Sequence, residues 1–404
     1  MESDRTRAEG PADASTGGAK GKGGRPVVLQ VLPRLETGGV ERGTVQIAQA
    51  IVEAGGTALV ASEGGALEPY LKRAGATHFA LPMASKNPWT MLRNTDRLMA
   101  LIARYEIQVV HARSRAPAWS AMAACKRGGA HFVTTFHGTY NFKSELKRRY
   151  NGIMTQGERV IANSQFIARH IKENYKINPA RLRVVQRGVD LLRFDPDSVA
   201  PERLAKLAAE WRLDDGVPVV LLPARLTRWK GQQLLLEALS RLDDLDLRCV
   251  MVGADQGRSA YRQELEREIT TRGMAGRAFL LDHCEDMAAA YRLADVVVNA
   301  SIEPEAFGRV IGEGQAMGRP VVAADHGGAP EQVTPGETGF LFAPGDPDAL
   351  ADALRQALSL SEADREALGE RAIAHVRAHF SLEQMCRKTL AVYDELLIGQ
   401  AGPP

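Results

Sequence analysis

The sequence predicts an α/β protein with two Rossmann-like domains, each built around a doubly wound parallel sheet. Short apolar runs alternate with amphipathic stretches of helical length, as in successive βαβ units. This alternation runs from residue 26 to about residue 195 and begins again near Val217. Polar or glycine-rich segments follow several of the apolar runs, at the sheet edge where such folds bind ligands. The length of 404 residues suffices for two domains.

In the first half, strands are expected where short apolar runs lie between turn signals. The predicted strands are Pro26–Leu32, Thr57–Ala61, Ile107–Val110 and His131–Phe136. An amphipathic helix is predicted after the first of them because Ile47, Ala48 and Ile51 share one face. Residues 1–25 are rich in Gly, Ala, Ser and charge without periodicity, so we predict a disordered tail there.

The second half repeats the pattern after a helical linker at Pro201–Trp211. Its first strand is predicted at Val217–Pro223 and is followed by an apolar helix, Leu234–Leu242. Val296–Val298 forms a later buried strand of the kind found in parallel sheets. The chain is expected to end in three helices: Pro347–Leu358, Glu362–His379 and Leu382–Leu397.

Two glutamates, Glu305 and Glu313, follow the Val296–Val298 strand. A helix that starts near Gly308 would direct free N–H groups and its positive dipole end toward an anion such as phosphate. Glu313 would lie about five residues inside that helix, roughly 7–8 Å along its axis, and its side chain would tilt back toward the helix start. Both carboxylates would then contact one extended ligand, a layout that fits a nucleotide diphosphate sugar. The alternative is two solvated surface glutamates.

Two further loops carry groups suited to a diphosphate. Gly38 and Gly39 stand at a strand-to-helix turn, where glycine allows the backbone to approach a phosphate or sugar. Arg225 and Lys230 follow the strand Val217–Pro223 and could neutralise a diphosphate, a role that a divalent metal can also fill. No Asp-x-Asp triplet directly follows the strands Val217–Pro223 or Val296–Val298, and the histidines lack metal-ligand spacing, so we predict neither a metal nor a cofactor.

The stretch from Glu305 to Val322 resembles the donor-site signature of the retaining glycosyltransferases of family 4, which have the two-domain GT-B fold. Further motifs extend the resemblance from about Val27 to Leu397. The resemblance implies that Glu313 holds the ribose hydroxyls of the donor and that Glu305 lies beside the donor sugar.

The same resemblance assigns the other donor contacts residue by residue. Arg225 and Lys230 would stabilise the charge that grows on the leaving diphosphate, and His137 would lie beside the donor sugar. With Glu305, these are the four residues predicted to be catalytic. The remaining donor contacts would come from glycine turns and from the segment that opens the helix: Gly38, Gly39, Gly253, Phe307, Gly308 and Arg309. Asparagine commonly stands where Arg187 is found here, and this departure leaves the role of Arg187 open.

The GT-B resemblance also implies how the chain is divided. Residues 26–195 would form an acceptor-binding domain and residues 196–380 a donor-binding domain, with a central cleft between them. The C-terminal helix, residues 381–398, would cross back to complete the first domain. The candidates for acceptor binding follow predicted strands of the first domain: His111, Arg113, Arg115 and Tyr140.

Charge is divided unequally between the two halves. Residues 1–200 contain 29 Lys and Arg against 17 Asp and Glu, a formal +12, whereas residues 201–404 contain 22 against 32, a formal −10. A basic half suggests an anionic partner. The densest basic cluster, which we predict to bind a membrane, contains Lys143, Lys147, Arg148 and Arg149. Aromatic residues beside it suit lipid headgroups or phosphorylated acceptors, and a solvated helix face is the alternative.

No apolar run approaches the ~18 residues of a membrane span, and the N-terminus lacks the apolar core of a signal peptide. We therefore predict a cytoplasmic enzyme that lies peripherally on the inner face of the cytoplasmic membrane. The four cysteines, at positions 125, 249, 284 and 386, are too far apart in sequence to form a recognisable metal site or disulfide framework.

Together these motifs predict a retaining, metal-independent hexosyltransferase. Its donor would be a UDP- or GDP-linked sugar, and its acceptor an anionic glycolipid or polysaccharide of the cell envelope, such as a lipopolysaccharide core intermediate. A GT-B sugar epimerase or phosphorylase is the main alternative. A nucleic-acid-binding module is a remote one, because it explains the basic half and not the acidic half, so we expect no nucleic acid partner.

Overall fold

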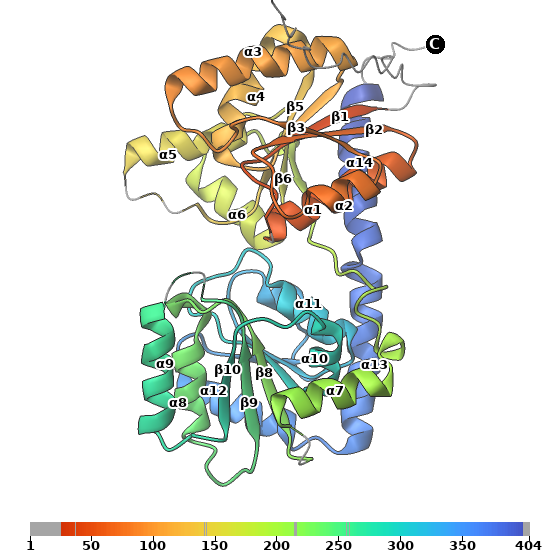
Figure 1. Cartoon of the computed structure of the whole chain (residues 1–404). Helices are drawn as coiled ribbons and strands as arrows, with labels where there is room; N and C mark the ends of the chain where they lie inside the picture. The colour runs from red at the N-terminus through yellow and green to blue at the C-terminus, as the bar shows by residue number, and fades with distance from the viewer. Residues whose placement is uncertain are drawn as a thin grey trace, which may run out of the picture.

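The structure is a computed structural model that describes residues 26–36, 38–140, 142, 144–213, 216–255, 257 and 259–398. The expected tail at residues 1–25 and one member of the basic cluster, Lys143, lie outside the described residues. Two α/β lobes lie one above the other (Figure 1). Two helices, α13 (Glu362–His379) and α14 (Leu382–Ile398), follow one another along one side of the lobes.

The first domain contains a parallel sheet of seven strands within the described residues, in the order β3-β2-β1-β4-β5-β6-β7. Its strands are β1 (Val27–Val31), β2 (Thr57–Ser62), β3 (Thr77–Ala80), β4 (Val109–Ala112), β5 (His131–Phe136), β6 (Arg159–Ala162) and β7 (Leu182–Val184). Its helices are α1 (Gly39–Glu53), α2 (Glu68–Arg73), α3 (Pro88–Tyr105), α4 (Arg115–Gly128), α5 (Glu145–Asn151) and α6 (Gln165–Asn174).

The second domain contains a parallel sheet of six described strands, in the order β10-β9-β8-β11-β12-β13. Its strands are β8 (Val219–Pro223), β9 (Arg248–Val252), β10 (Ala278–Leu281), β11 (Val296–Asn299), β12 (Val321–Ala324) and β13 (Phe340–Phe342). Its remaining helices are α7 (Pro201–Trp211), α8 (Gln232–Leu239), α9 (Ser259–Thr271), α10 (Met287–Leu293), α11 (Arg309–Ala316) and α12 (Pro347–Leu358). Two doubly wound, Rossmann-like parallel-sheet domains are thereby confirmed.

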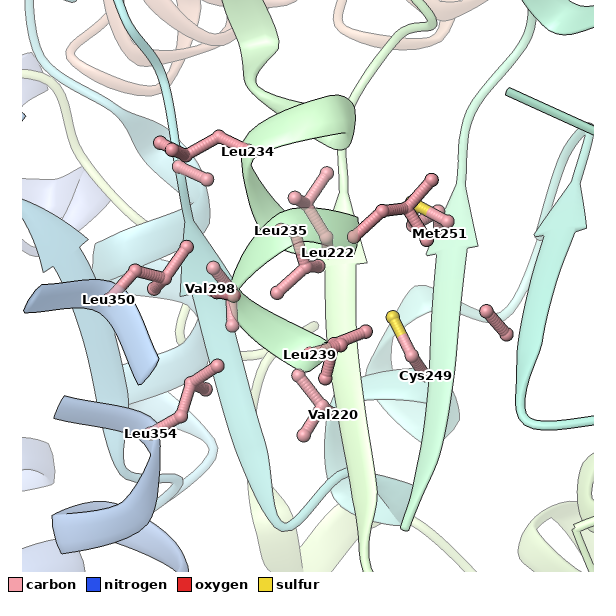
Figure 2. Packing of buried hydrophobic residues seen from close by; sticks show 14 of the residues in the cluster. Val220, Leu222, Leu234, Leu235, Leu239, Cys249, Met251, Val298, Leu350 and Leu354 are labelled. Atoms are coloured by element: carbon pink, nitrogen blue, oxygen red, sulfur yellow. The ribbon is translucent and has the colours of Figure 1, made fainter. Parts of the chain in front are cut away.

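Helices cover both faces of each sheet, which is why the strands are continuous apolar runs and do not alternate. Strand β1, for example, is buried at all five residues. In the first domain α3, α4 and α6 pack on one face, and α1 and α14 on the other. In the second domain, leucines of α8 and α12 lie against β8, β9 and β11 (Figure 2). The opposite face is covered by α7, α10 and α11.

The two domains are joined where two segments of the chain cross. The backbone N–H of Val189 donates to the carbonyl of Phe380 at 2.8 Å, and the N–H of Leu382 donates to the carbonyl of Val189 at 2.8 Å. Gly188 is required here, because a Cβ on it would lie 2.5 Å from the Cα of Leu382. After this crossing α14 packs into the first domain, where Tyr393 is fully buried.

A second bond between the domains forms at the start of α6. Ser164 caps this helix by accepting from the N–H of Ile167 at 3.0 Å. The carboxylate of Glu331, from the second domain, accepts from the N–H groups of Gln165 at 2.8 Å and Phe166 at 2.6 Å. A carboxylate at a helix N-terminus is favourable because the helix dipole is positive there, so Glu331 ties the second domain to the first.

The strand order of each sheet reverses once. The two strands at the reversal are neighbours, so the loops that follow them lie side by side. The reversal lies between β1 and β4 in the first domain and between β8 and β11 in the second. Open α/β sheets bind ligands at this point, outside the carboxyl ends of the strands. The loops after β8 and β11 are the ones that carry Arg225, Lys230 and Glu305.

The core of the second domain predicts a clear contrast between two leucine substitutions. Leu235 on α8 is fully buried in the cluster shown in Figure 2, whereas Leu192 is 92% exposed. Leu235→Ala should lower the free energy of unfolding by about 2–5 kcal/mol, because it removes buried methyl groups and leaves a cavity. Leu192→Ala should change it by less than about 0.5 kcal/mol. Urea unfolding followed by tryptophan fluorescence measures both, and equal effects would contradict this packing.

Candidate active site

Lys230 and Glu305 form a buried ion pair at the strand reversal of the second domain. Lys230 lies in the loop after β8 and Glu305 in the loop after β11, and these strands are neighbours. The ammonium Nζ of Lys230 is 2.7 Å from Oε1 of Glu305, and the two side chains are only 12% and 17% exposed. Lys230 Nζ also lies 4.4 Å from the ring centre of Trp229. The loops therefore bring together two of the four residues predicted to be catalytic.

The carboxylate of Glu305 is held through one oxygen. Besides Lys230, Oε1 accepts from Nδ2 of Asn299 at 3.0 Å and from Oγ of Ser301 at 2.5 Å. Burial opposes ionisation of the Glu305 carboxyl, but Lys230 and the hydrogen bonds outweigh burial, so the pKa of Glu305 lies below its usual value. Among the described residues no partner binds Oε2. Glu305 is therefore an oriented anion with one oxygen left for a ligand.

Two glycines allow these loops to come together. Gly231 has a positive φ of 76°, and a Cβ on it would collide with the carbonyl oxygen of Ala300 in the loop after β11. Gly253 lies directly against the backbone of Ala224, and a Cβ on it would lie 2.9 Å from the amide nitrogen of Arg225. Gly253 thus fits a role beside the Arg225 loop, where the sequence predicted a direct approach to the nucleotide.

The helix α11 begins at Gly308 in the left-handed conformation, with φ 84°, and no side chain caps it. Buried Gln332 donates from Nε2 to the carbonyl of Phe307 and holds the segment ahead of the helix. The N–H of Gly328 donates to the carbonyl of Glu305 at 2.9 Å. The uncapped helix start therefore lies next to Glu305 on a fixed backbone, and its N–H groups suit an anion.

Glu313 lies on α11 and lines a cavity of about 220 Å³ between the domains. Its Oε2 accepts a 2.7 Å hydrogen bond from the hydroxyl of Tyr291, which is fully buried on α10. Burial, followed by the neighbouring Glu313, raises the pKa of Tyr291 well above its usual value, so the phenol stays a donor. Tyr291 thereby fixes the orientation of the Glu313 carboxylate.

The cavity is rich in positive charge contributed by both domains. Its arginines are Arg42, Arg187, Arg193 and Arg309, and the acidic residues that line it are Asp190 and Glu313. A Cβ on Gly39 would lie 3.6 Å from Nε of Arg309, so Arg309 extends from the second domain onto the glycine turn of the first. Gly38 in the same turn starts α1 without a side-chain cap. Excess cations beside two uncapped helix starts suit a diphosphate.

His137 follows β5 and is paired with Arg187, the residue whose role the sequence left open. Nη2 of Arg187 lies 2.9 Å from Nδ1 of His137. Burial, and then the charges of Arg187 and Arg113, hold the pKa of His137 well below its usual value. Burial and two neighbouring arginines lower the pKa of Arg187 to about 9. Sequence reasoning singled out both residues but gave no sign that they meet.

His111 does not reach the cleft, which corrects its prediction as an acceptor ligand. It is 0% exposed, and both ring nitrogens are bonded at 2.7 Å, Nδ1 to the hydroxyl of Tyr393 and Nε2 to Oγ1 of Thr135. His111 therefore attaches α14 to the first sheet. The neighbouring Arg113 is 4% exposed and donates to Gln30 at 3.3 Å, while its Nε has no partner among the described residues.

Arg115 and Tyr140 lie together on the first domain. The guanidinium carbon of Arg115 is 4.4 Å from the ring centre of Tyr140, and its Nη1 donates to Oδ1 of Asn151 at 2.8 Å. Asn151 in turn donates to the carbonyl of Tyr140 at 3.1 Å. These contacts fix the loop after β5 against the start of α4. They place Arg115 and Tyr140 in one group next to His137, whose backbone N–H donates to the Tyr140 hydroxyl.

The described part of the basic cluster lies on the short helix α5. Glu145 on the same helix pairs with Arg148 at 2.8 Å and with Arg149 at 3.7 Å, and Lys147 is exposed. Leu146 on this helix is 79% exposed, and on α3 Trp89 is 75% exposed. The surface is therefore both basic and apolar, although Glu145 offsets part of its charge.

Neither a metal-binding cluster nor a membrane-spanning helix is present among the described residues. In that part of the chain, no group of three or more His, Cys, Asp or Glu side chains is arranged to hold a metal ion. No described helix combines the length and apolar character needed to cross a membrane.

Several polar groups of the site were not anticipated from the sequence. Asn299 and Ser301 flank the end of β11, and their place at a strand end was the available signal. Tyr291 stands in the apolar run Met287–Leu293 and carried no signal at all. Arg42 and Arg193 reach the cavity only because the fold brings α1 next to the segment 185–195 that connects the two domains, which we call the hinge.

Comparison with known families assigns both domains. Residues 37–193 match the model of Glycosyltransferase Family 4, and residues 205–375 match that of Glycosyl transferases group 1.

Similar curated proteins include the D-inositol 3-phosphate glycosyltransferase of Corynebacterium glutamicum, which is 32% identical over 270 residues, or 64% of this chain and 62% of that protein. The protein of the same name from Geodermatophilus obscurus is 36% identical over 252 residues, or 60% of this chain and 53% of that protein. The matched segment thus spans less than two thirds of these relatives.

Solved structures match over more of the chain. A glycosyltransferase of Rickettsia africae is 39% identical, with a TM-score of 0.87, over 92% of this chain and 99% of that one. HepE of Anabaena, solved in complex with UDP and glucose, is 23% identical, with a TM-score of 0.81, over 92% of this chain and 100% of that one, and shares the fold. The chain belongs to the GT-B glycosyltransferases of group 1 and family 4.

Proposed function

We propose that this protein is a retaining glycosyltransferase that moves a hexose-type sugar from a nucleotide diphosphate sugar to an anionic acceptor. The observation that carries the proposal is the buried Lys230–Glu305 pair beside the uncapped start of α11. An anion that offers one free oxygen suits sugar hydroxyls, and the helix start suits a phosphate. In this proposal the second domain binds the donor and the first binds the acceptor.

The donor contacts follow the polarity of the site. Glu313, oriented by Tyr291, accepts from the ribose hydroxyls at the cavity. Arg225, Lys230 and the N–H groups of Phe307–Arg309 contact the diphosphate, with the Gly38–Gly39 turn opposite them. A UDP-linked hexose is the favoured donor, since HepE of Anabaena, a protein with the same fold, was solved with UDP-glucose. No metal ion is needed if the cations neutralise the leaving group.

The proposed mechanism is substitution on one face of the sugar. The leaving diphosphate accepts the proton of the acceptor hydroxyl, while Arg225 and Lys230 stabilise its growing charge. A double displacement would require a carboxylate nucleophile under the anomeric carbon. The ammonium of Lys230 and two hydrogen bonds to Oε1 lower the pKa of Glu305, so its free oxygen Oε2 is less basic and a weaker nucleophile. We therefore assign Glu305 to sugar hydroxyls, with His137 on the other side of the sugar.

The acceptor is proposed to carry a phosphate or a similar anionic group. Arg113, Arg115 and Tyr140 are the acceptor contacts, since they lie on the first domain near His137, whereas buried His111 is not one. An envelope glycolipid, such as a lipopolysaccharide core intermediate, is the acceptor that suits the basic first domain. The relatives named D-inositol 3-phosphate glycosyltransferases support a soluble phosphorylated polyol as the second candidate.

A glycolipid acceptor would place the enzyme on the cytoplasmic face of the membrane. The surface formed by Lys147, Arg148 and Arg149 on α5, with exposed Leu146, offers the cations and apolar side chains that anionic bilayers attract. Exposed Trp89 on α3 suits the interface for the same reason.

Two alternative functions differ from this proposal. A GT-B epimerase or phosphorylase would share the architecture, and a nucleic-acid-binding module would use basic surface without the Glu305 site.

The donor prediction is tested by thermal denaturation in the presence of nucleotide sugars. A bound donor should raise the midpoint in a concentration-dependent way, because ligand binding stabilises the folded state by mass action. UDP-hexoses should raise the midpoint more than GDP-hexoses do. Free UDP, added without a sugar, should also raise it. If none of these ligands shifts the midpoint, the donor proposal fails. With an acceptor supplied, nucleotide diphosphate should appear only alongside a product of retained anomeric configuration; an inverted product would refute the mechanism.

The two glutamates should differ in their kinetic effects. Glu313→Ala should raise the donor KM by about tenfold with a smaller change in kcat, because its contact to the ribose is the same in ground and transition states. Glu305→Ala should mainly lower kcat, by about 100-fold. Glu370→Ala, an exposed glutamate on α13, is the matched control and should leave both constants unchanged. The reverse pattern would show that the two roles are exchanged.

The membrane surface is tested by sedimentation with lipid vesicles. Binding to phosphatidylglycerol vesicles should exceed binding to phosphatidylcholine vesicles and should weaken as salt rises, because salt screens surface charge. The Lys147→Ala, Arg148→Ala, Arg149→Ala triple variant should lose most of this binding. A control triple variant with alanine at Arg267, Arg371 and Arg377, which are exposed on the second domain, should keep it. Equal binding by the two triple variants would refute the membrane proposal.

A further inference from the structure

Arg187 stands on the segment that connects the domains, and its guanidinium reaches the first domain's side of the cleft. Its Nη2 lies 2.9 Å from Nδ1 of His137. A guanidinium has five N–H donors and no acceptor, so the bond forms only if Nδ1 of His137 carries no proton. The single proton of the neutral imidazole must then lie on Nε2. The partner therefore dictates the tautomer of His137.

The other ring nitrogen of His137 lacks a partner. Nε2 is buried, and within the described part of the chain nothing accepts its proton. The backbone N–H of the same residue is accounted for, since it donates to the hydroxyl of Tyr140 at 3.4 Å. A buried donor without an acceptor is rare in native proteins and indicates a site that another molecule completes. A hydroxyl of the donor sugar, which accepts through its oxygen, is the group that the proposed reaction supplies.

The surroundings keep His137 uncharged. The titratable or charged groups that face it are Arg187 from the hinge, Arg113 and His111 from the β4 edge, and Tyr140 from its own loop. None of these is an anion at neutral pH. Burial, followed by the charges of Arg187 and Arg113, therefore holds the pKa of His137 well below its usual value. The imidazole stays neutral at pH values where a solvent-exposed histidine would be protonated.

Arg187 is seated against a glycine inside α1. A Cβ on Gly43 would lie 2.5 Å from Nη1 of Arg187 and 3.0 Å from Nη2 of Arg113, so any larger residue would displace a guanidinium. Glycine within a helix is less favourable than alanine. Its presence at this position is explained by the space that the two guanidinium groups occupy.

The seat of Arg187 is also tied to the crossing between the domains. The next residue, Gly188, donates its N–H to Sδ of Met385 on α14 at 3.3 Å, and Val189 pairs with Phe380. Arg309 of the second domain is close enough to contribute to the lowered pKa of Arg187. The position of the guanidinium therefore depends on how the two domains meet.

Resting on the proposed function, we propose that Arg187 is a positioning residue that fixes His137 as a neutral Nε2–H donor to the donor sugar. Arg187 does not touch the sugar in this proposal; it acts through Nδ1 of His137. Because Arg187 belongs to the interdomain hinge, the Nε2–H group of His137 is correctly oriented only when the hinge has the conformation seen here. The residue that departs from the family pattern thereby links domain arrangement to the sugar site.

The tautomer is tested without any substrate by long-range ¹H–¹⁵N spectra of protein labelled at its nine histidines. His137→Ala identifies the signal of interest by its loss. In the parent protein Nδ1 should be unprotonated, Nε2 protonated, and neither should titrate between pH 8 and pH 5. In Arg187→Met the pKa of His137 should rise toward the usual value of about 6.5, because the positive charge of Arg187, which disfavours protonation of the imidazole, is removed. Arg187→Lys, which keeps a charge and a donor, should restore much of the parent spectrum.

Kinetics then test whether Arg187 acts through His137. Arg187→Met should lower kcat by about tenfold or more with little change in donor KM, and should add an ionisation between pH 5 and pH 7 to the kcat profile. In a His137→Ala background the same substitution should have no further effect on kcat. Arg183→Met, which removes a half-buried arginine on β7 that pairs with Glu395, is the control and should behave like the parent.

A protonated Nδ1 in the parent protein would overturn the proposal, and so would an equal loss of kcat in the His137→Ala background. If Arg187→Met proves unstable in thermal denaturation, Arg187→Gln, which removes the charge but keeps a polar side chain, carries the same comparison. Failure of the glycosyltransferase proposal would appear as absent transfer with an intact tautomer signal, so the two failures are distinguishable.

Discussion

The ion pair between Lys230 and Glu305 is the interaction on which the rest of the site depends. Buried charges are tolerated only when each has a close partner, and removal of one partner strands the other. The pair forms because the strand order places β8 beside β11 and because Gly231 and Gly253 let the loops approach. Once Oε1 of Glu305 is held, its second oxygen and the start of α11 have fixed relative positions.

Unbalanced positive charge is the second physical feature of the cleft. Arg42, Arg193 and Arg309 line one cavity with Glu313, and the guanidinium group of Arg309 from the second domain approaches the Gly38–Gly39 turn of the first. Burial, followed by the charges of neighbouring arginines, lowers the pKa of both Arg42 and Arg187, so holding these cations together is unfavourable in the unliganded protein. A polyanionic ligand such as a nucleotide diphosphate would relieve this repulsion, which gives the site a physical reason to favour it.

The long helix α14 joins the first domain to the hinge. Its Tyr393 bonds His111 under the first sheet, and its Met385 accepts from the hinge at Gly188. A histidine that looked like a ligand in the sequence is thus part of the framework, while Arg187, which had no assigned role, contacts His137. Because Arg187 lies on the hinge and bonds His137, a change in the hinge would also displace the partner of His137.

The sequence by itself determined the fold class, because the period of apolar residues depends only on local chemistry. It also singled out Glu305, Glu313 and Lys230 as candidates, since each follows a strand whose carboxyl end is expected at the ligand edge of the sheet. Only the tertiary structure decided which of these side chains meet, that His111 is sealed in the core, and that Arg187 pairs with His137 across 50 residues of chain. Such contacts depend on strand order and on the angle between domains, and no local pattern encodes either.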